Sequence, residues 1–459
     1  MAEVVVCGGS VIGLSTAMLL AGDGHQVTVL ERDPAPPPSD PRDGWGGWER
    51  RGVAQFRQAH NLFARFRQIL DDELPGMVGE LVEAGCVEVD PLALVPTSVR
   101  GPRRRSDDDR FRFVTGRRPV VEAVLAHAAD RQDGIDVRRG VGVAGLLTAG
   151  SLVPGAPHVT GVRTTEGYEL GADLVVDAMG RRTTLAQWLV AAGGRRPHTE
   201  SEDCGFVYHT RYFRGRAVPR LLGPPVAEIG TISLLTIPGD NGTWSVTVWG
   251  SSDDVALKRL REPERFTAVV RACPLQARWV DAEPITDVMV MAGIMDRYRR
   301  FVVEGRPVAT GVAAVGDAWA CTNPSAGRGV TVGLVHAQSL RNVVRSHGDD
   351  PERLARAWDE ATEADVAPFY RDQIEADRRR VAEMDALRAD EEPPPREPST
   401  VALAEATMND PDVFRGALET AMCLALPREV LARPGFLDKV RAAAEVVPDL
   451  VEMRWWSPA

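Results

Sequence analysis

The first thirty residues restrict the fold of this chain more than any other stretch, because they alternate between two kinds of apolar pattern. Residues 3–7 are a short β-branched run, residues 11–21 have helical character, and residues 26–30 form a second apolar run. A short run of β-branched residues is typical of a buried strand, whereas a longer run with helical spacing is typical of a helix. The N-terminus therefore predicts a β-α-β unit.

The turn between the first strand and the helix reads GGSVIG. Gly8 permits a tight turn, and Gly13 allows the helix to pack closely on the strand. Ser10 stands where the dinucleotide-binding fingerprint prefers a second glycine, and its small side chain leaves the approach to a pyrophosphate mostly open. The start of the helix near Val11 offers backbone N–H groups to phosphates, and Glu31 ends the second strand, where a carboxylate accepts from ribose hydroxyls. These features predict nucleotide binding. The alternative is a tight turn in an ordinary β-α-β unit.

A second glycine-rich stretch, residues 140–145, reads GVGVAG and matches GxGxxG better than the first. The residues that follow it reach Pro154 before a helix can develop. Without a helix N-terminus the stretch lacks the backbone groups that bind phosphate. We therefore predict a strand here, and no second dinucleotide fold.

A third stretch, residues 315–333, reads VGDAWACTNPSAGRGVTVG. An apolar strand is predicted over residues 308–315, followed by Asp317, a glycine loop that begins with a proline, and a helix through Ser339. Asp317 is placed to accept hydrogen bonds from the hydroxyls of a sugar chain. The N–H groups of residues 327–330 can face an electron-rich ring or an oxygen anion.

The middle and the end of the chain have residue patterns that differ from those of these motifs. Between Cys204 and Met295, aromatic and β-branched residues alternate with polar ones, which predicts antiparallel strands in an inserted sheet. Helices are predicted over residues 54–70 and 118–129, and again after Pro351. Residues 34–48 are rich in Pro, Gly and Asp and predict a mobile surface loop, in which Trp45 and Trp48 either cover a ligand or anchor the loop. No internal repeat is visible.

Charge and cysteine content exclude some classes of function. The net charge of −11 argues against a nucleic-acid surface, which needs clustered positive charge. The six cysteines show no CxxC pair and no metal-ligand spacing, so we expect a reduced, metal-free, cytoplasmic protein. The apolar run over residues 4–22 contains four glycines and no positive residues precede it, so it is better explained as strand and helix than as a signal peptide or membrane span.

These motifs together resemble those of FAD-dependent monooxygenases of the aromatic-hydroxylase and squalene-epoxidase type, which have a glutathione-reductase-like FAD fold. The resemblance rests on GGSVIG, on DLVVDAMG at residues 173–180, and on the GD loop at residues 315–333. It is weaker over residues 190–290 and almost absent beyond residue 390. The cofactor contacts that it implies are Gly8, Gly9, Ser10, Gly13, Glu31, Arg32, Arg118, Val141, Asp177, Gly316, Asp317, Pro324, Gly327, Arg328, Gly329 and Val330.

Two residues are candidates for a catalytic role. Arg328 departs from the glycine of the squalene-epoxidase loop and resembles the lysine that aromatic hydroxylases carry there. His60 begins the helix predicted near the flavin, as an acid, a base or a substrate contact, or as a structural hydrogen-bonding residue. Ser10 is the second departure from the family pattern.

The resemblance implies an α/β fold with a Rossmann-like FAD-binding domain, an inserted antiparallel β-sheet domain and a C-terminal helical region. We predict the FAD-binding domain over residues 1–195 and 290–350 and the substrate-binding sheet over residues 196–289. The helical region covers residues 351–459, with a proline-rich break at residues 391–398.

The function that the resemblance implies is hydroxylation or epoxidation of a mostly apolar small molecule with one atom of O₂, through a flavin C4a-hydroperoxide. FAD is the expected cofactor, with NAD(P)H as electron donor, either directly or through a flavin reductase. A flavin-dependent reductase of the geranylgeranyl-reductase type, a flavin halogenase and a non-catalytic nucleotide-binding protein remain as alternatives. Halogenation is disfavoured because the first lysine is Lys258 and no Trp-x-Trp-x-Ile-Pro motif is present. No nucleic-acid partner and no membrane span are expected.

Overall fold

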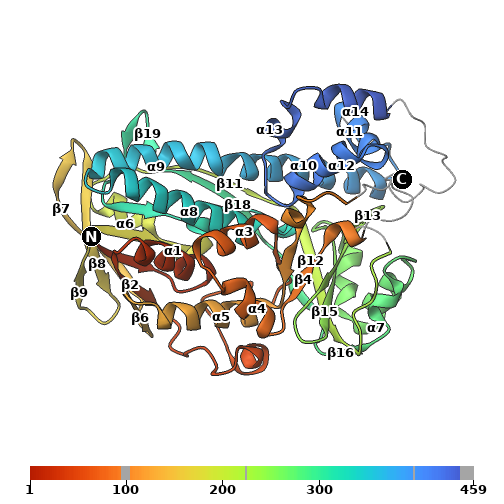
Figure 1. Cartoon of the computed structure of the whole chain (residues 1–459), viewed down its shortest axis with the longest axis horizontal. Helices are drawn as coiled ribbons and strands as arrows, with labels where there is room; N and C mark the ends of the chain where they lie inside the picture. Colours follow the sequence, from red (N-terminus) through yellow and green to blue (C-terminus); the bar gives the residue numbers. More distant parts are fainter. Residues whose placement is uncertain (95–103, 223–224, 396–397, 445–459) are drawn as a thin grey trace.

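The computed structural model describes residues 1–94, 104–222, 225–395 and 398–444, and every statement of structure below refers to these residues. Residues 396 and 397 of the predicted proline-rich break, and residues 445–459 of the predicted C-terminal region, lie outside them. The described chain combines helices with parallel and antiparallel sheets, as the predicted α/β fold class requires (Figure 1).

A five-stranded parallel sheet contains the predicted β-α-β unit. The first strand β1 pairs with β2 on one side and with β10 on the other, so the N-terminal strand lies at the centre. Each neighbouring pair in this sheet is parallel, which places all the carboxyl ends at one edge. In spatial order the strands are β21 (Val312–Ala314), β10 (Leu174–Asp177), β1 (Glu3–Cys7), β2 (Gln26–Glu31) and β6 (Ile135–Arg139).

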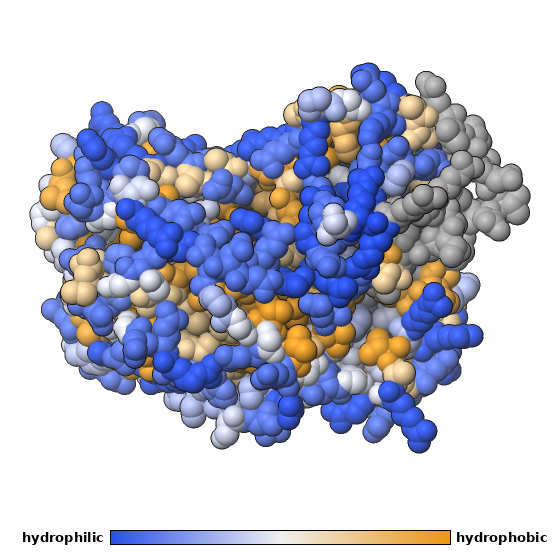
Figure 2. Space-filling view, in the orientation of Figure 1, coloured by the Kyte–Doolittle hydropathy of each residue, from blue (hydrophilic) through white to orange (hydrophobic). Residues whose placement is uncertain are grey.

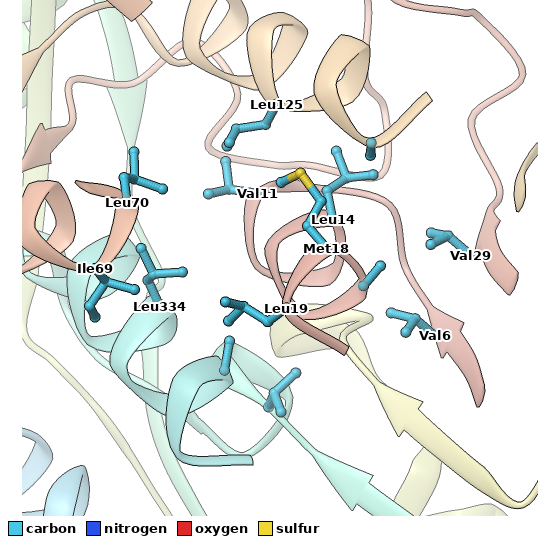
Figure 3. Packing of buried hydrophobic residues seen from close by; sticks show 14 of the residues in the cluster. Val6, Val11, Leu14, Met18, Leu19, Val29, Ile69, Leu70, Leu125 and Leu334 are labelled. Carbon is cyan, nitrogen blue, oxygen red and sulfur yellow. The ribbon is translucent and has the colours of Figure 1, made fainter. Parts of the chain in front are cut away.

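Helix α1 (Val11–Gly22) is apolar on all sides because it is enclosed by other elements. Figure 3 shows Leu14, Met18 and Leu19 of α1 among side chains from the sheet and from three other helices. Burying one such leucine or methionine contributes roughly 1.5–3 kcal/mol. The three helices are α3 (Ala64–Glu73), α5 (Arg118–Arg131) and α8 (Gly329–His347).

A second, larger sheet is antiparallel and lies at the other end of the molecule (Figure 1). One of its faces packs against helix α7 (Pro263–Arg271) through Phe213, Trp244 and Phe266. The opposite face is turned towards the parallel sheet and closes the cavity described below. Its strands are β13 (Val226–Ile229), β14 (Ile232–Pro238), β15 (Thr243–Ser251), β12 (Phe206–Arg214), β16 (Glu283–Pro284) and β17 (Met289–Met291).

The other strands and α-helices of the described chain lie outside the two large sheets and the helices named above. Three further sheets have three strands each and one has two. Their strands are β3 (Asn61–Leu62), β5 (Phe113–Thr115) and β4 (Val87–Val89); β7 (Val143–Val153), β8 (Ala156–Thr164) and β9 (Glu169–Gly171); β11 (His198–Asp203), β18 (Met295–Arg300) and β22 (Ala320–Cys321); and β19 (Val302–Val303) with β20 (Arg306–Pro307). The remaining α-helices are α2 (Gly44–Gly47), α4 (Met77–Glu83), α6 (Leu185–Ala191), α9 (Pro351–Asp365), α10 (Ala367–Arg388), α11 (Pro398–Asn409), α12 (Pro411–Ala421), α13 (Pro427–Leu431) and α14 (Phe436–Ala444).

A buried ion pair joins the antiparallel sheet to the start of α5. Arg117, immediately before α5, donates to Asp240 from its backbone N–H and twice from its guanidinium, at 2.6–2.9 Å. Asp240 lies in the turn between β14 and β15, and both side chains are at most 3% exposed. Breaking such a pair on one side leaves a buried charge without a partner. The antiparallel sheet is therefore fixed against the nucleotide motifs by residues at its hairpin turn.

The structure corrects three local expectations. Residues 54–63 are turns and the short strand β3, so the predicted helix over residues 54–70 begins only at Ala64. The loop over residues 34–48 is not loose, because Trp48 is 2% exposed and donates to the carbonyl of Ala35. The strand predicted over residues 308–315 is limited to Val312–Ala314.

The surface drawn in Figure 2 is mostly hydrophilic. On the face drawn in Figure 2, hydrophilic side chains cover most of the surface, and hydrophobic ones appear between them near its middle. Within the described residues, no helix is both long and apolar enough to cross a membrane.

Candidate cofactor and substrate site

One cavity of about 550 Å³ connects the carboxyl edge of the parallel sheet with the inner face of the antiparallel sheet. This volume is within the range of small-molecule sites. Thirteen of the residues predicted from the sequence line it: Gly8, Ser10, Gly13, Glu31, Arg32, His60, Arg118, Val141, Asp317, Pro324, Gly327, Gly329 and Val330. Gly9, Asp177, Gly316 and Arg328 do not.

The GGSVIG turn is compact for the reason that its glycines predict. Gly8 has a φ of +111°, and a Cβ there would lie 2.6 Å from the carbonyl oxygen of Ala178. A Cβ on Gly13 would lie 1.8 Å from the carbonyl oxygen of Gly8, far inside van der Waals contact. The close approach of strand and helix therefore brings the N-terminus of α1 to the cavity wall, where its dipole favours an anion.

Beside this turn, Arg118 connects two other predicted site residues, Ser10 and His60. Its guanidinium donates to the hydroxyl of Ser10 at 2.9 Å and to Nε2 of His60 at 3.0 Å. It also pairs with the buried carboxylate of Glu122 at 3.0 Å. The arginine is thus held in one orientation, with its positive charge beside the GGSVIG turn.

His60 is a neutral side chain in this arrangement. Its Nδ1 lies 2.9 Å from the carbonyl oxygen of Gln58, so Nδ1 carries the proton and Nε2 accepts from Arg118. Burial, and secondarily the charge of Arg118, lower the pKa of His60 to about 3. With its lone pair already engaged, His60 is better suited to orient Arg118 than to act as the acid or base considered from the sequence.

Glu31 is held by a buried network that the sequence analysis missed. Its carboxylate accepts from the N–H of Gly9 at 2.9 Å and from Arg50 at 2.6 Å. Arg50 also pairs with Glu122 at 2.8 Å and with Asp33 at 3.3 Å, and its side chain is only 2% exposed. Gly9 therefore acts behind the cavity wall and orients Glu31. The two acids at residues 31 and 33 signalled a basic partner, but nothing in the sequence singled out Arg50.

Asp177 is also behind the wall. Its carboxylate accepts from the N–H of Met179 and from the hydroxyl of Thr183, and it is 1% exposed. Burial raises the pKa of Asp177 to about 6. Residues 179–184 line the cavity, so Asp177 shapes this loop without reaching the cavity itself. A contact of Asp177 with a cofactor stays a prediction, and the bonds present connect it with the loop that lines the cavity.

The GD loop closes the cavity on the side of α8. Gly316 donates its N–H to Nδ1 of His336 at 3.1 Å, and Nε2 of His336 lies 3.1 Å from the hydroxyl of Thr362. Gly316 therefore fixes the loop from behind. Asp317 lines the cavity, where loss of water raises its pKa, while Arg118 and Arg181 act in the opposite direction.

Arg328 faces away from this cavity. It lines a smaller space of about 40 Å³ beside α8 and α10. Its charge acts on Asp372 and Asp377 of α10, whose pKa values burial raises. Arg328 is not among the residues that line the large cavity, and its catalytic role stays a prediction.

The GVGVAG stretch contributes to the wall in another way. No helix follows it, since residues 143–153 form β7, in agreement with the predicted strand. Val141 donates its N–H to the carbonyl of Glu31, and residues 140–143 line the cavity. The stretch is thus a flat wall beside the end of β2.

The opposite end of the cavity is formed by the antiparallel sheet and is uncharged. Tyr208 and Trp249 stand opposite each other on β12 and β15, with ring centroids 5.8 Å apart and planes inclined by 21°. Thr210 and Thr247 form the next opposite pair, with their hydroxyl oxygens 2.9 Å apart. The hydroxyl of Tyr208 donates to the side-chain oxygen of Asn323 in the GD loop. The apolar residues Leu235, Met291 and Ile294 also line this end.

Comparison with known proteins defines the class of fold. No family model matches the chain. The structure is similar to PqsL, a probable FAD-dependent monooxygenase from Pseudomonas aeruginosa, with a TM-score of 0.62 and 16% identity over 84% of this chain and 96% of PqsL. It is also similar to the anhydrotetracycline hydroxylase OxyS from Streptomyces rimosus, with a TM-score of 0.59 and 19% identity over 93% of this chain and 76% of OxyS. The chain has the fold of FAD-dependent monooxygenases.

The particular relative found by sequence is Protein Rv3254 from Mycobacterium tuberculosis, which is 28% identical over 386 residues, covering 78% of this chain and 77% of the relative. The fold also occurs in the flavin-dependent brominase Bmp2, at a TM-score of 0.55 and 16% identity over 98% of this chain and 94% of Bmp2. The fold alone therefore does not select one flavin reaction.

Proposed function

We propose that this protein is an FAD-dependent monooxygenase that inserts one oxygen atom of O₂ into a mostly apolar small molecule. The observation that carries the proposal is the single cavity that joins the GGSVIG turn and the GD loop to an uncharged, aromatic sheet face. A cofactor and a substrate bound at its two ends would meet inside one continuous space.

The residues present fit an FAD. The turn at Gly8 and Gly13 leaves no room for a Cβ, which is the geometry that lets backbone approach a pyrophosphate. Arg118 supplies a fixed positive charge beside Ser10, and Glu31 lies at the end of β2 for the adenosine ribose. Asp317 and residues 324–330 would hold the ribityl chain and the ring. When bound, reduced flavin supplies the activation of O₂.

The protein's own contribution is to orient and to exclude water. Leu235, Met291 and Ile294 make the sheet end apolar, which would exclude water from the place where the cofactor meets the substrate. The bond from Tyr208 to Asn323 fixes the distance between this end and the GD loop. No acid or base is assigned, because the side chains that line the sheet end are uncharged.

Two alternatives make different demands on the cavity. A flavin-dependent reductase would use the same fold and cofactor without oxygen, so dependence of turnover on O₂ separates it from the proposal. A halogenase requires an active-site lysine, and the described lining residues include no lysine. A non-catalytic nucleotide-binding protein would show no flavin reduction with any donor.

The first test is the visible spectrum of the purified protein in anaerobic buffer, before and after NADPH is added. We expect a flavin spectrum that bleaches and returns on admission of air. If NADPH alone leaves the flavin oxidised, the measurement is repeated with a flavin reductase and with substrate candidates. A colourless protein that still binds NADP would contradict the proposal.

The second test is the flavin content of Asp317→Ala. We expect this variant to lose most of its FAD on gel filtration, because Asp317 lines the cavity where the GD loop meets α8. The control is Asp349→Ala, an exposed aspartate in the turn after α8, which should retain FAD. Wild-type flavin content in Asp317→Ala would contradict the placement of the GD loop.

A further inference from the structure

The antiparallel sheet presents two cross-strand pairs of residues to the cavity. One is the aromatic pair Tyr208 and Trp249, and the other is the hydroxyl pair Thr210 and Thr247. Residues directly opposite on antiparallel strands share a face, so Thr210 and Thr247 lie on the same face as Tyr208 and Trp249. All four line the cavity and all are at most 5% exposed. Around them stand Leu235, Met291 and Ile294, and none of the described lining residues from this sheet is charged.

The hydroxyls of Thr210 and Thr247 are not fully paired by each other. Each hydroxyl offers one donor and two acceptor lone pairs. Their mutual bond of 2.9 Å uses one hydrogen, and neither oxygen has another protein partner in the structure. One O–H group and several lone pairs are therefore left without a partner on buried side chains, where an unpaired polar group is unfavourable.

We propose that Thr210 and Thr247 together are the specificity-determining hydrogen-bonding pair of the substrate site. The inference rests on the proposed function and deepens it. The pair takes a hydroxyl or carbonyl oxygen on an otherwise flat, neutral, apolar molecule, which lies beside the Tyr208 and Trp249 rings. Charged molecules are rejected, because no side chain of opposite charge lines this end of the cavity.

A cross-strand threonine pair also stabilises a sheet without any ligand. The two roles differ in what removal of the hydroxyls changes. A structural pair affects the stability of the sheet equally for every ligand, whereas a specificity pair changes the preference between ligands of the same shape. The preference is therefore the quantity to measure.

The probes are three molecules of one shape: 2-naphthol, which is neutral and carries a hydroxyl; 2-methylnaphthalene, which lacks a hydrogen-bonding group; and 2-naphthoate, which is charged. Equilibrium dialysis against the flavin-loaded protein gives a Kd for each without requiring turnover. For the wild type we expect 2-naphthol to bind about tenfold tighter than 2-methylnaphthalene, which corresponds to one hydrogen bond. The anion should bind weakest.

The test variant is the double substitution Thr210→Val with Thr247→Val. Removing only one hydroxyl would leave the other unpaired, whereas removing both does not. We expect this double variant to bind 2-naphthol and 2-methylnaphthalene equally. The matched control is Thr236→Val, since Thr236 is a buried threonine on β14 that follows the cavity-lining Leu235 and so faces the other side of the sheet. The control should keep the preference of the wild type.

Four results would overturn the inference: a preference that survives in the double variant, a preference lost equally in Thr236→Val, tight binding of 2-naphthoate, or no binding of any probe by the wild type. The proposed function fails on different data, namely a protein without flavin or a flavin that no donor reduces. A flavin enzyme without the naphthol preference would contradict this inference alone.

Discussion

The two ends of the cavity hold their shape by different means. At the nucleotide end, buried charges surround the GGSVIG turn, with Arg50 bonded to three carboxylates and Arg118 bonded to Ser10, His60 and Glu122. At the sheet end, aromatic rings, apolar side chains and a few hydroxyls suffice. A site that binds one unchanging cofactor can be built from buried charged side chains held in fixed positions. A substrate end that avoids charge can be changed one side chain at a time.

The largest effect is expected from Gly13→Val at the nucleotide end. A side chain there collides with the backbone carbonyl of Gly8, a closer clash than the overpacking that costs roughly 1–3 kcal/mol, so we expect a loss larger than for any substitution below and insoluble or flavin-free protein. The measurement is soluble yield and flavin content. Gly22→Ala, on the same helix with open space around its Cβ, should fold and bind flavin normally. Normal flavin loading in Gly13→Val would remove the main support for the nucleotide end.

Next in size is Arg50→Met. The substitution leaves Glu31, Asp33 and Glu122 without their shared partner in a region where the Arg50 side chain is 2% exposed. Breaking a buried pair on one side costs about 3–5 kcal/mol. Urea unfolding should show this loss. Arg131→Met, whose pair with Glu80 is largely exposed, should cost less than about 1 kcal/mol. Equal losses in the two variants would contradict the contrast between buried and exposed pairs.

The third prediction concerns the loss of folding stability at acidic pH through His336. Burial lowers the pKa of His336 from 6.5 to about 3. The unfolded chain therefore binds a proton at this histidine below about pH 6.5, while the folded protein stays neutral there until about pH 3. The stability that a neutral His336 supplies is present above pH 6.5 and is lost as the pH falls towards 3.

The variant that isolates this contribution is His336→Gln. It should be less stable than the wild type at pH 7.5, because the contacts with Gly316 and Thr362 change. It should also lose less stability between pH 6.5 and 4, because one proton-binding difference is gone. Urea midpoints measured across this range give both quantities. Parallel curves for the two proteins would contradict the assignment.

The smallest effect is expected where the two ends meet. Tyr208→Phe removes the donor to Asn323 and leaves the amide oxygen without that bond, at a cost of about 1–3 kcal/mol. Tyr212→Phe on the same strand is the control, because the buried hydroxyl of Tyr212 has no hydrogen-bond partner. Urea unfolding should therefore show a loss for Tyr208→Phe and little or none for Tyr212→Phe. Similar values for the two would mean that the contact with the GD loop does not stabilise the protein.

Most residues assigned from the motifs line the cavity at this end, because the signals for their positions are local. Gly8, Gly13 and Asp317 reach the cavity by short turns directly after strands, and backbone geometry fixes such positions within a few residues. Arg50 could not be predicted, since its three carboxylate partners lie at residues 31, 33 and 122 and only the folded chain brings them together.

Arg328 shows the same limit in the opposite direction. Its place in the GD loop is correct in sequence, but the side chain of a residue just before α8 can face either side of the loop. Its charge acts on two acids of α10, and those acids belong to a part of the chain that no motif covered. The sheet end was predicted only as alternating strands, because alternation assigns a residue to a face but does not say which face is the wall of a cavity.

The ion pair between Arg117 and Asp240 has a consequence for how such a protein changes over generations. The pair attaches the antiparallel sheet through its hairpin turn, and neither residue lines the cavity. Mutations on the cavity face of the sheet can therefore accumulate without loosening the attachment, and the cofactor machinery is inherited intact while the substrate is exchanged. Lineages that keep Arg117 and Asp240 would be free to diversify at residues 210, 247 and 249.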